Sequence, residues 1–363
     1  MKKLVAIDLF SGAGGTTAGL KKAGVDVRAA VEINSIAAKT YLLNNPEVTI
    51  FEKDIKEIKA EELARELGKL DNQSLILVAC PPCQGFSSIG THNKYDIRNQ
   101  LIFEYERLIQ ELNPEFLLME NVAGMSRGIG KEIFKQFRES ISEKYEIVYD
   151  ILNAADYGVP QTRKRLVVHG IRKDILSKVN QKTNFKISLP IQTHSEEGKT
   201  KALWVNSEVI LDLPPIKAGE EYKGDGVYNH ISNNLSDINI RRIQHIRKHG
   251  GDRTSLPDHL VLECHKRSSG HKDVYGVLDS SKPAITITGG CMSYSKGRFG
   301  HPTQDRALSA REAARLQSFD DEYIFIGNKT QLATQIGNAV PVKLAEASGK
   351  YFIKLAEILG DEI

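Results

Sequence analysis

The fold is decided by the stretch Leu4-Val5-Ala6-Ile7-Asp8-Leu9-Phe10-Ser11-Gly12-Ala13-Gly14-Gly15. Its apolar half, Leu4–Leu9, predicts a buried strand, and the glycines after it predict a tight turn before a helix. Such a turn lets the backbone pass close to a nucleotide-like ligand, but strand–glycine–helix turns are also common as purely structural units. On its own, this stretch therefore predicts a strand and a helix rather than a function.

Strand-like and helix-like segments alternate outward from this stretch through the first half of the chain. Four further apolar runs predict buried strands: Val27–Val31, Leu75–Ala79, Phe116–Met119 and Leu166–Gly170. Amphipathic stretches predict helices between them: Thr16–Ala23, Ile36–Asn44, Glu57–Leu67, Asn99–Leu112 and Lys131–Ser142. This alternation predicts an α/β fold with a doubly wound, mostly parallel sheet and helices on both faces. In such sheets ligands bind beyond the carboxyl ends of the strands.

The pattern changes after about residue 172. From Asn184 to His301 the chain is rich in Gly, Ser and Asn, has few long amphipathic stretches, and contains a strand-like run at Ala284–Thr288. Helical patterning resumes at Leu308 and ends in Val342–Leu359. Single cores stop growing near ~250–300 residues, so a chain of 363 residues is expected to form two lobes. We expect a first, larger domain at 1–183, a smaller loop-rich domain at 184–329, and a C-terminal segment at 330–363 that returns to the first domain.

Net charge and its distribution limit the classes of partner. Lys and Arg total 49 and Asp and Glu total 46, so the formal net charge is only +3. The protein is therefore no polycation, and any nucleic-acid surface must come from local polarisation. Within Arg241–Lys272 there are eight basic residues, three acidic residues and five of the ten His. Such a charged run is usually a solvated surface. Here the excess charge is positive and lies in an irregular lobe, which favours contact with phosphates.

Cysteine content and hydropathy indicate the compartment. Four Cys in a chain of this length do not make a disulfide framework, which indicates a reducing environment. Asp8 interrupts the apolar start too early for a signal peptide, and no later run approaches the length that spans a membrane. We therefore expect a cytoplasmic protein with no membrane partner.

Acidic residues follow two of the expected strands. Glu32 ends the second strand, where a carboxylate can accept hydrogen bonds from ribose hydroxyls. Asp54 and Ile55 follow a third candidate strand, where they could hold the edge and the face of an adenine. No phosphate-binding GxxxxGK(S/T) sequence occurs, and Phe10 stands where a pyrophosphate would need room. The sequence therefore favours S-adenosylmethionine over NAD or ATP as the cofactor.

The segment Cys80-Pro81-Pro82-Cys83 follows the fourth strand and permits three interpretations. Zinc binding would need a second pair of ligands, but Cys264 and Cys291 are isolated, so we expect no metal. A thioredoxin-like redox pair would open a helix near the start of the fold rather than follow a fourth strand. The third interpretation is a single nucleophile, Cys83, which would attack as a thiolate and should have positive charge nearby.

Residues near the ends of two later strands could assist such a nucleophile. Glu120-Asn121-Val122 ends the fifth strand, and Gln161-Thr162-Arg163-Lys164-Arg165 leads into the last one. Taken singly, Glu120 could be a helix cap and the two arginines surface residues. Together with Cys83 on one ligand-binding edge, they would provide a nucleophile, an acid and two charge-stabilising groups.

These segments resemble those of the cytosine-C5 DNA methyltransferases of bacterial type. The chain matches that family in order and spacing through Asp8–Gly15, Pro81–Ser87, Glu120–Val122, Gln161–Arg165, Arg306–Glu312, Arg315–Phe319 and Gln335–Pro341. The resemblance spans nearly the whole chain except about residues 175–280, and its Pro-Pro-Cys-Gln-Gly-Phe-Ser block is highly specific. One departure is Cys80, where many members have Gly, and we expect no functional consequence. The resemblance implies a Rossmann-like methyltransferase fold in which 1–183 is the catalytic and cofactor-binding domain and 184–329 is the target-recognition domain.

The resemblance implies methyl transfer from S-adenosylmethionine to carbon 5 of a cytosine in a specific duplex DNA sequence. Cys83 would add to carbon 6 of the ring, while Glu120 would hydrogen-bond ring nitrogen 3 and the amino group. Arg165 would hold the base and the Glu120 carboxylate, and Arg163 would assist nearby. The reacting atoms are inaccessible inside a stacked duplex, so the cytosine must be flipped out. The polar segment Ser87–Arg98 would then close over it.

The remaining expected site residues contact either cofactor or DNA. Those expected at the cofactor are Phe10, Gly12, Ala13, Gly14, Gly15, Glu32, Ile33, Asp54, Ile55, Pro82, Leu101, Asn338 and Ala339. Those expected at DNA are Gln84, Ser87, Arg98, Arg241, Arg242, Lys248, Arg253, Lys266 and Arg267. Asn338 and Ala339 would return from the C-terminal part of the chain to complete the cofactor pocket.

Two other functions remain open on the sequence. A tRNA cytosine methyltransferase would use the same scaffold, but that branch typically has a compact variable region, whereas residues 184–301 form a long one. A non-catalytic DNA-binding relative would have lost its nucleophile, whereas Cys83, Glu120 and Arg165 are all intact. We expect a monomer, which could be paired with a cognate restriction endonuclease or belong to a defence system.

Overall fold

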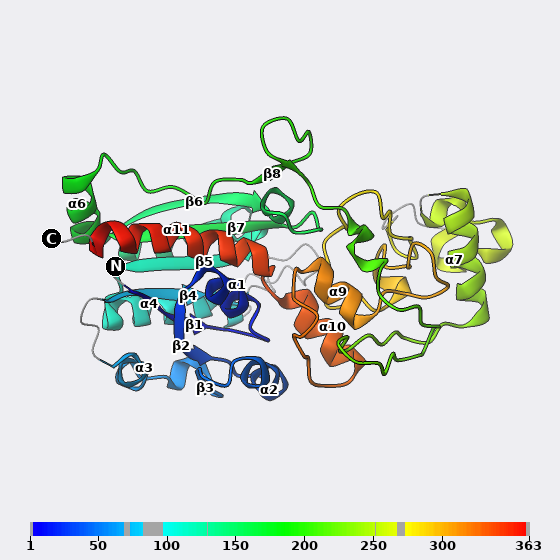
Figure 1. The fold of residues 1–363 in the computed structure, drawn as a ribbon, viewed down its shortest axis with the longest axis horizontal. Coiled ribbons are helices and arrows are strands. Elements are labelled where there is room, and N and C mark those ends of the chain that lie inside the picture. The colour runs from blue at the N-terminus through cyan, green and yellow to red at the C-terminus, as the bar shows by residue number, and fades with distance from the viewer. Residues whose placement is uncertain are drawn as a thin grey trace. The chain divides into compact units, whose positions relative to one another are not determined.

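A computed structural model gives the fold and describes residues 3–68, 73–82, 97–128, 130–250, 252–266 and 273–360. The chain divides into two compact units (Figure 1). Unit 1 comprises residues 1–157, 164–193 and 340–363, and unit 2 comprises residues 158–163 and 194–339. These borders differ from the expected ones, since 158–163 and 330–339 lie in unit 2 and 184–193 lies in unit 1.

Unit 1 is built on a seven-stranded sheet with the strand order β3-β2-β1-β4-β5-β7-β6. Its strands are β1 (Lys3–Leu9), β2 (Asp26–Val31), β3 (Thr49–Phe51), β4 (Gln73–Ala79), β5 (Phe116–Val122), β6 (Tyr145–Asn153) and β7 (Lys164–Arg172). Strands β1 to β5 pair in parallel, whereas β7 is antiparallel to both β5 and β6. The prediction of a doubly wound, mostly parallel sheet is confirmed, although the sequence pattern did not indicate β6.

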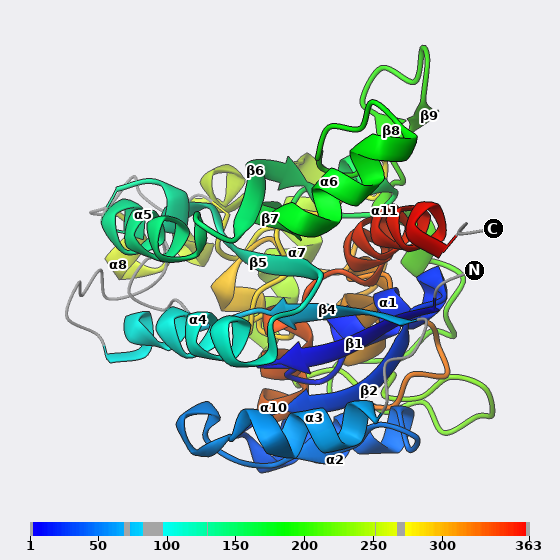
Figure 2. The same cartoon turned by 90° about the vertical axis from the view of Figure 1, so that its left-hand side faces the viewer.

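Helices cover both faces of this sheet, as strands that are apolar on both sides require (Figures 1 and 2). The helical segments of unit 1 are α1 (Gly15–Ala23), α2 (Ser35–Asn44), η1 (Ile55–Glu57), α3 (Ala60–Leu67), η2 (Ile97–Gln100), α4 (Leu101–Leu112), η3 (Ala123–Ser126), α5 (Gly130–Ile141), η4 (Ala154–Tyr157), α6 (Lys173–Lys182) and α11 (Val342–Gly360). Helices α3, α4 and α5 pack on one face, and α1 and α11 on the other. Within the described ranges, no helix is long and apolar enough to cross a membrane.

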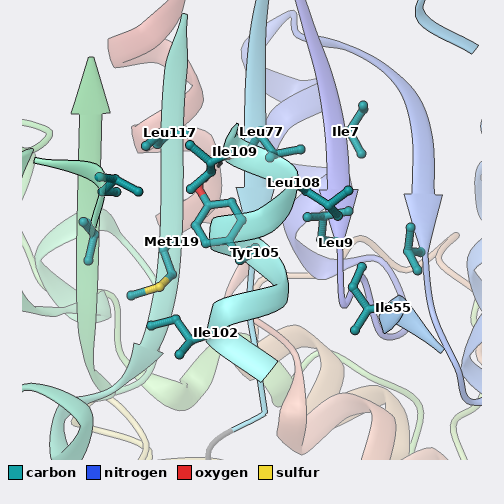
Figure 3. Close-up of a cluster of buried hydrophobic side chains, with 14 of the residues drawn as sticks. Ile7, Leu9, Ile55, Leu77, Ile102, Tyr105, Leu108, Ile109, Leu117 and Met119 are labelled. Carbon is teal, nitrogen blue, oxygen red and sulfur yellow. Dashed lines mark hydrogen bonds between the residues drawn. The ribbon is translucent and has the colours of Figure 1, made fainter. Parts of the chain in front are cut away.

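An apolar cluster fills the space between the sheet and the α3–α5 layer (Figure 3). Ile7 and Leu9 of β1 both face this cluster, because side chains two residues apart on a strand point to the same side. Tyr105 of α4 is buried here, and its hydroxyl donates a hydrogen bond to the backbone oxygen of Leu77 at 2.9 Å. The bond satisfies a polar group that would otherwise be costly to bury.

The C-terminal helix α11 packs against α1 on the opposite face. Gly19 of α1 permits this contact, since a Cβ added there would lie 2.6 Å from the Cβ of Ala345 and 2.7 Å from the backbone nitrogen of Glu346. Beneath α11, the buried His169 of β7 places its Nε2 at 3.1 Å from the hydroxyl of Ser348. The helix expected at the end of the chain is therefore present and belongs to unit 1.

Unit 2 is rich in loops. Its regular segments are β8 (His194–Ser195), β9 (Ala202–Leu203), η5 (Ser207–Ile210), α7 (Asp237–His249), η6 (Arg253–Ser255), η7 (Asp258–Leu260), α8 (Glu263–Lys266), η8 (Tyr294–Lys296), α9 (Ala310–Leu316) and α10 (Lys329–Asn338). The strand expected at Ala284–Thr288 is not formed, because Ala284 makes only an isolated bridge to Gln161. The segment instead pairs with a side chain, since the N–H of Ile287 donates to Oε1 of Gln161 at 2.7 Å.

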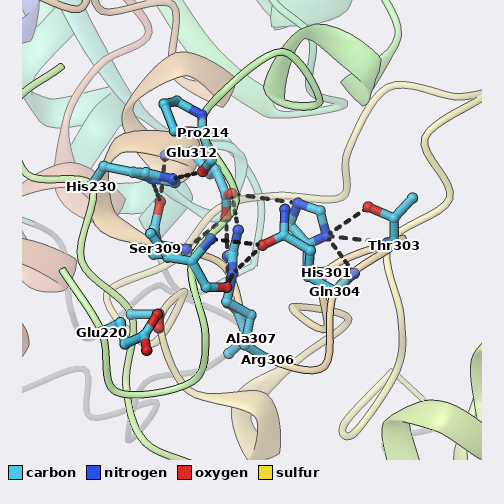
Figure 4. Close-up of polar contacts among 12 residues, drawn as sticks. Pro214, Glu220, His230, His301, Thr303, Gln304, Arg306, Ala307, Ser309 and Glu312 are labelled. Atoms are coloured by element: carbon cyan, nitrogen blue, oxygen red, sulfur yellow. Dashed lines mark hydrogen bonds and ion pairs between the residues drawn. The ribbon is translucent and has the colours of Figure 1, made fainter. Parts of the chain in front are cut away.

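Buried polar contacts connect the loops of unit 2 (Figure 4). Arg306 and Glu312 are fully buried and form two hydrogen bonds, with N···O distances of 2.6 and 2.8 Å. Glu312 also accepts a hydrogen bond from the backbone N–H of Ser309, which caps α9. Burial raises the pKa of Glu312, but the hydrogen bonds and charges of Arg306 and His301 together outweigh this effect and lower that pKa to about 2.

Candidate active site

The carboxyl ends of β1, β2 and β4 form one edge of the sheet in unit 1. The three strands end in register there, since Leu9 pairs with both Val31 and Ala79. The backbone N–H of Ser11 donates to the oxygen of Val31 at 3.0 Å, and that of Cys80 donates to the oxygen of Leu9 at 3.3 Å. The segments that follow the strands are therefore tied to this edge, where a doubly wound sheet binds its ligand.

The glycine-rich turn after β1 bends sharply. Phe10 has a φ of 58°, a left-handed conformation that is strained for a bulky side chain. Gly12 and Gly14 follow with φ angles of 55° and 91°. The N–H of Gly12 donates to Oε2 of Glu32 at 2.8 Å, which links the turn to the end of β2. Strain of this kind is typical of sites where a ligand must be approached closely.

Glu32 is held by the backbone on two sides. Its Oε2 accepts from Gly12, and its Oε1 accepts from the N–H of Asn34 at 2.7 Å. Burial raises the pKa of Glu32, and the hydrogen bonds from Asn34 and Gly12 oppose that rise. The side chain of Ile33 beside it is 65% exposed. A fixed carboxylate with spare lone pairs next to an exposed aliphatic side chain fits the hydroxyls and flat face of a nucleoside.

The other expected cofactor residues of unit 1 lie at the same strand ends. Asp54 follows β3 and caps η1, where its carboxylate accepts from the N–H of Lys56 at 3.0 Å. Ile55 is buried in the apolar cluster, and Phe10 and Leu101 pack partly buried against it. Asp54 and Phe10 therefore keep accessible surface at the edge, whereas Ile55 mainly supports the core.

Asp8 is a buried carboxylate that directly precedes the turn. Its Oδ2 accepts from the hydroxyl of Thr17 at 2.7 Å, and that hydroxyl lies 2.8 Å from the hydroxyl of Tyr41. Its Oδ1 has no hydrogen-bond partner in the described part of the chain. Burial, with a smaller contribution from Glu32, raises the pKa of Asp8 to about 7. Sequence reasoning gave Asp8 no role, and only its place at the end of β1 could have indicated one.

The start of the Pro-Pro-Cys segment is fixed by β5. The side-chain amide of Asn121 donates to the backbone oxygen of Pro81 at 3.0 Å, and its oxygen accepts from the N–H of Val122 at 2.8 Å. Asn121 is a second residue that sequence reasoning missed, although it directly follows Glu120. Four expected site residues lie outside the described residues: Cys83, Gln84, Ser87 and Arg267. The side chain of Arg98 is likewise outside the description.

Glu120 and Arg165 form an ion pair between β5 and β7. The antiparallel register places Val122 opposite Arg165, so Glu120, two residues earlier, lies on the same face of the sheet and diagonally across from Arg165. Nε of Arg165 is 3.1 Å from Oε1 of Glu120, and both side chains are largely buried. The structure thus brings together two of the four residues expected to be catalytic.

Arg163 and the C-terminal residues of the expected pocket lie in unit 2. Arg163 is 2% exposed, and its guanidinium donates to backbone carbonyls of that unit. Asn338 ends α10 and is exposed, and Ala339 follows it. Their contacts with a cofactor remain predictions.

Cys80 has the properties of a packed thiol. Its sulfur is 3.6 Å from the hydroxyl of Thr16. Burial, reinforced by the carboxylate of Glu120, raises the pKa of Cys80 well above its usual range, so the thiol stays protonated. In the described ranges, no group of three or more His, Cys, Asp or Glu residues is arranged to hold a metal ion.

The basic residues expected at DNA differ in their surroundings. Arg241 and Lys248 are exposed on α7, seven residues apart and hence on one side of the helix. Lys266 is exposed beside Glu263, with an N···O distance of 2.5 Å. Arg242 and Arg253 are buried, and Arg242 donates from Nε to a backbone oxygen at 2.7 Å. Arg241 and Lys248 are therefore the better placed for phosphates.

Comparison with known proteins gives concordant matches. The family model of the C-5 cytosine-specific DNA methylases matches residues 4–354. The Type II methylase M.HgiDII of Herpetosiphon aurantiacus is 38% identical over 361 residues, which cover 97% of this chain and 95% of the relative. The Type II methyltransferase M1.HphI of Haemophilus parahaemolyticus is 34% identical over 361 residues, with coverages of 97% and 87%. A crystal structure of an E. coli prophage protein, assigned as a DNA modification methyltransferase, matches with a TM-score of 0.68 and 26% identity, covering 98% of this chain and all of that one.

Proposed function

Because the chain belongs to the C-5 cytosine-specific DNA methylase family, we propose that it methylates carbon 5 of a cytosine within a specific duplex sequence, with S-adenosylmethionine as the methyl donor. The observation that carries the proposal is the Glu120–Arg165 ion pair at the carboxyl ends of the strands. This pair adjoins the segment that leads to Cys83, because Asn121 of the same strand binds Pro81. An acid, a guanidinium and a thiol are therefore expected on one edge.

The residues at this edge fit S-adenosylmethionine. The turn at Gly12 leaves open space where a side chain would stand, since a Cβ there would have no heavy atom within 4 Å. Glu32 would bind the ribose hydroxyls, Ile33 and Phe10 would cover the adenine, and Asp54 would bind its edge. When bound, the cofactor would supply an electrophilic methyl group to the activated carbon 5.

The chain's own groups would activate the cytosine. The Cys83 thiolate would add to carbon 6, and the electron pair of the carbon 5–carbon 6 double bond would move toward carbon 5. Glu120 would hydrogen-bond ring nitrogen 3 and the amino group as charge develops there. Arg165 would orient Glu120 and stabilise the carbonyl oxygen on carbon 2 of the base. Loss of the carbon 5 proton and expulsion of the Cys83 thiolate would then restore the aromatic ring.

The duplex would have to release the target base, because carbon 6 is shielded in the stack. Segment Ser87–Arg98 would close over the extruded cytosine. The second unit would bind the duplex, with the exposed Arg241 and Lys248 contacting phosphates. This unit would act as the target-recognition domain of a monomeric, cytoplasmic enzyme.

The relatives also bear on the biological partner. Both of the relatives reported above are named Type II enzymes. We propose that this enzyme likewise protects its target sequence against a cognate restriction endonuclease. The two enzymes would recognise the same DNA sequence and would not need to bind each other.

Bisulfite sequencing tests the proposed function directly. Expression in cells that lack cytosine methylation should give 5-methylcytosine at every copy of one short DNA sequence, and Glu120→Gln should remove it. In vitro, a duplex carrying that sequence should accept the methyl group and a tRNA should not. Methylation of tRNA alone, or of no nucleic acid, would contradict the proposal.

A further inference from the structure

Three buried side chains of unit 2, Gln161, Arg163 and Gln317, form a polar cluster, which we call the Gln–Arg cluster. Gln161 donates from Nε2 to Oε1 of Gln317 at 2.8 Å. Gln317 in turn donates from its Nε2 to the backbone oxygens of Ile336 at 2.7 Å and Ala339 at 3.2 Å. The cluster therefore binds the backbone at the C-terminal end of α10.

Arg163 binds the same end of α10 and also a second segment. Its Nη1 donates to the backbone oxygen of Ile287 at 2.6 Å, and its Nη2 donates to those of Gly337 at 3.0 Å and Ala339 at 3.2 Å. The last carbonyls of a helix have no partner within the helix, and a cation there also complements the helix dipole. One guanidinium thus caps α10 and ties it to the chain at Ile287.

Close backbone packing makes this double contact feasible. Any side chain at Gly337 would overlap the backbone of Thr288 and Gly289, so α10 lies directly against that segment. The planar fork of an arginine can reach carbonyls on both sides, whereas a lysine offers a single ammonium group.

The cluster lies at both points at which the chain passes from unit 2 to unit 1. Arg163 is the last residue of segment 158–163, and β7, which begins at the next residue, carries Arg165. Ala339 is the last residue of unit 2 before α11, which packs on α1, the helix that follows the glycine-rich turn. After Arg163 the chain continues into β7, which carries Arg165 of the Glu120–Arg165 pair. After Ala339 it continues into α11, which packs on α1.

We propose that Arg163 is a positioning residue rather than a group that touches the base. It holds residues 337–339, where the cofactor pocket is expected to be completed, against segment 158–163 of the same unit, which leads directly into β7. Its 2% exposure and its three carbonyl contacts support this role. The inference rests on the proposed function, because that function assigns residues 337–339 to the cofactor pocket and Arg165 to the cytosine.

Arg163→Lys tests this role, because it keeps the charge and removes the fork. The matched control is Arg311→Lys. Arg311 is also buried in unit 2 and donates to three backbone oxygens, those of Tyr228, Asp320 and Tyr323. It lies on α9, at no point where the chain changes units. The measurements are the dissociation constant of S-adenosylmethionine by calorimetry, kcat and KM on duplex DNA, and the unfolding midpoint, all on the full chain.

Arg163→Lys is expected to weaken cofactor binding and lower kcat by about tenfold or more, as loss of hydrogen bonds from a charged group implies. Arg311→Lys should leave the dissociation constant of S-adenosylmethionine and kcat within about twofold of the wild type, because distant sites act independently. This result is expected even if Arg311→Lys loses as much thermal stability as Arg163→Lys, or more. Equal effects of the two variants at matched stability would contradict the positioning role, as would full activity of Arg163→Lys.

Two further outcomes are informative. If Arg163→Lys does not fold, Gln317→Leu, which removes the donors to Ile336 and Ala339, is measured instead with the same expected losses. A wild-type protein that binds S-adenosylmethionine but methylates no DNA would contradict the proposed function, while the binding measurement would still decide the role of Arg163. A wild-type protein that does not bind the cofactor would contradict both.

Discussion

Asp8 is a buried carboxylate at the active-site edge with incomplete hydrogen bonding. Burial raises its pKa from 3.8 to about 7, and its Oδ1 has no partner in the described part of the chain. A carboxyl group with a raised pKa in the folded state resists ionisation there. Its contribution to stability is therefore fully present below about pH 4 and is lost as the pH rises to 7. Asp8 thus makes the folded protein less stable at neutral pH than it would be with a neutral side chain.

Asp8→Asn should remove this pH dependence, because the amide has the same shape and cannot ionise. Between pH 5 and pH 7 the wild type should lose up to about 1.4 kcal/mol of unfolding free energy per pH unit relative to the variant. Urea unfolding at pH 5, 6, 7 and 8 measures the difference, with the exposed Asp150→Asn as the control for loss of one charge. Parallel curves for wild type and Asp8→Asn would show that Asp8 ionises normally.

At the residue scale, sequence reasoning succeeded where function follows from position along a strand. Glu120 and Arg165 could be placed on one edge because both lie at strand ends, and the register brings them together. The contacts of Arg163 could not be predicted, since its partners Ile287, in a loop, and Gly337, near the end of α10, lie 124 and 174 residues away in the sequence. Long-range contacts to backbone carbonyls leave no pattern in side-chain type.

At the element scale, the packing of α11 on α1 depends on Gly19. Replacing glycine by alanine inside a helix ordinarily stabilises by about 0.5–1 kcal/mol. Here the new methyl group would lie 2.6 Å from Ala345 Cβ and 2.7 Å from the backbone of Glu346, so the helices must separate. We expect Gly19→Ala to reduce the unfolding free energy by about 1–3 kcal/mol, as overpacking does, and to weaken S-adenosylmethionine binding.

Thermal unfolding and calorimetry measure the two effects of Gly19→Ala. Ala18→Ser, at a half-exposed position of the same helix, should change stability by no more than about 0.5 kcal/mol. An increase in stability for Gly19→Ala would mean that helix propensity outweighs the contact with α11.

Sequence patterns identified elements only where burial is one-sided or complete. Strand β6 lies at the edge of the sheet, and most of its side chains are exposed or half-exposed, so it contains no continuous apolar run. Segment Ala284–Thr288 has the composition of a strand, but it forms hydrogen bonds with the irregular segment 160–163 instead of with a neighbouring strand. The loop-rich unit was predictable as a region and not in its internal contacts.

At the scale of the whole molecule, unit 2 is the part proposed to bind DNA, although the net charge of the chain is only +3. Reversing the charges of Arg241 and Lys248 together should weaken duplex binding and reduce the slope of log K against log salt by about 2, near 0.9 for each lost phosphate contact. Binding titrations between 50 and 200 mM salt, about the range in which this effect is large, measure the slope. Lys39→Glu with Lys178→Glu changes the net charge equally on exposed positions of unit 1 and should leave the slope unchanged. Equal slopes for both double variants would place the DNA surface elsewhere.

Cys83 is proposed to be the only cysteine that forms a covalent bond with the target cytosine. With fluorine at carbon 5 of the target cytosine, elimination is blocked. Incubation of the protein with this fluorinated duplex and S-adenosylmethionine should therefore give a protein–DNA adduct that survives denaturation. The adduct should form with the wild type and with Cys80→Ala, because the buried Cys80 thiol stays protonated. It should be absent with Cys83→Ser, since a hydroxyl supplies almost no anion at neutral pH. Equal loss of the adduct in both cysteine variants, or an adduct with Cys83→Ser, would contradict the account.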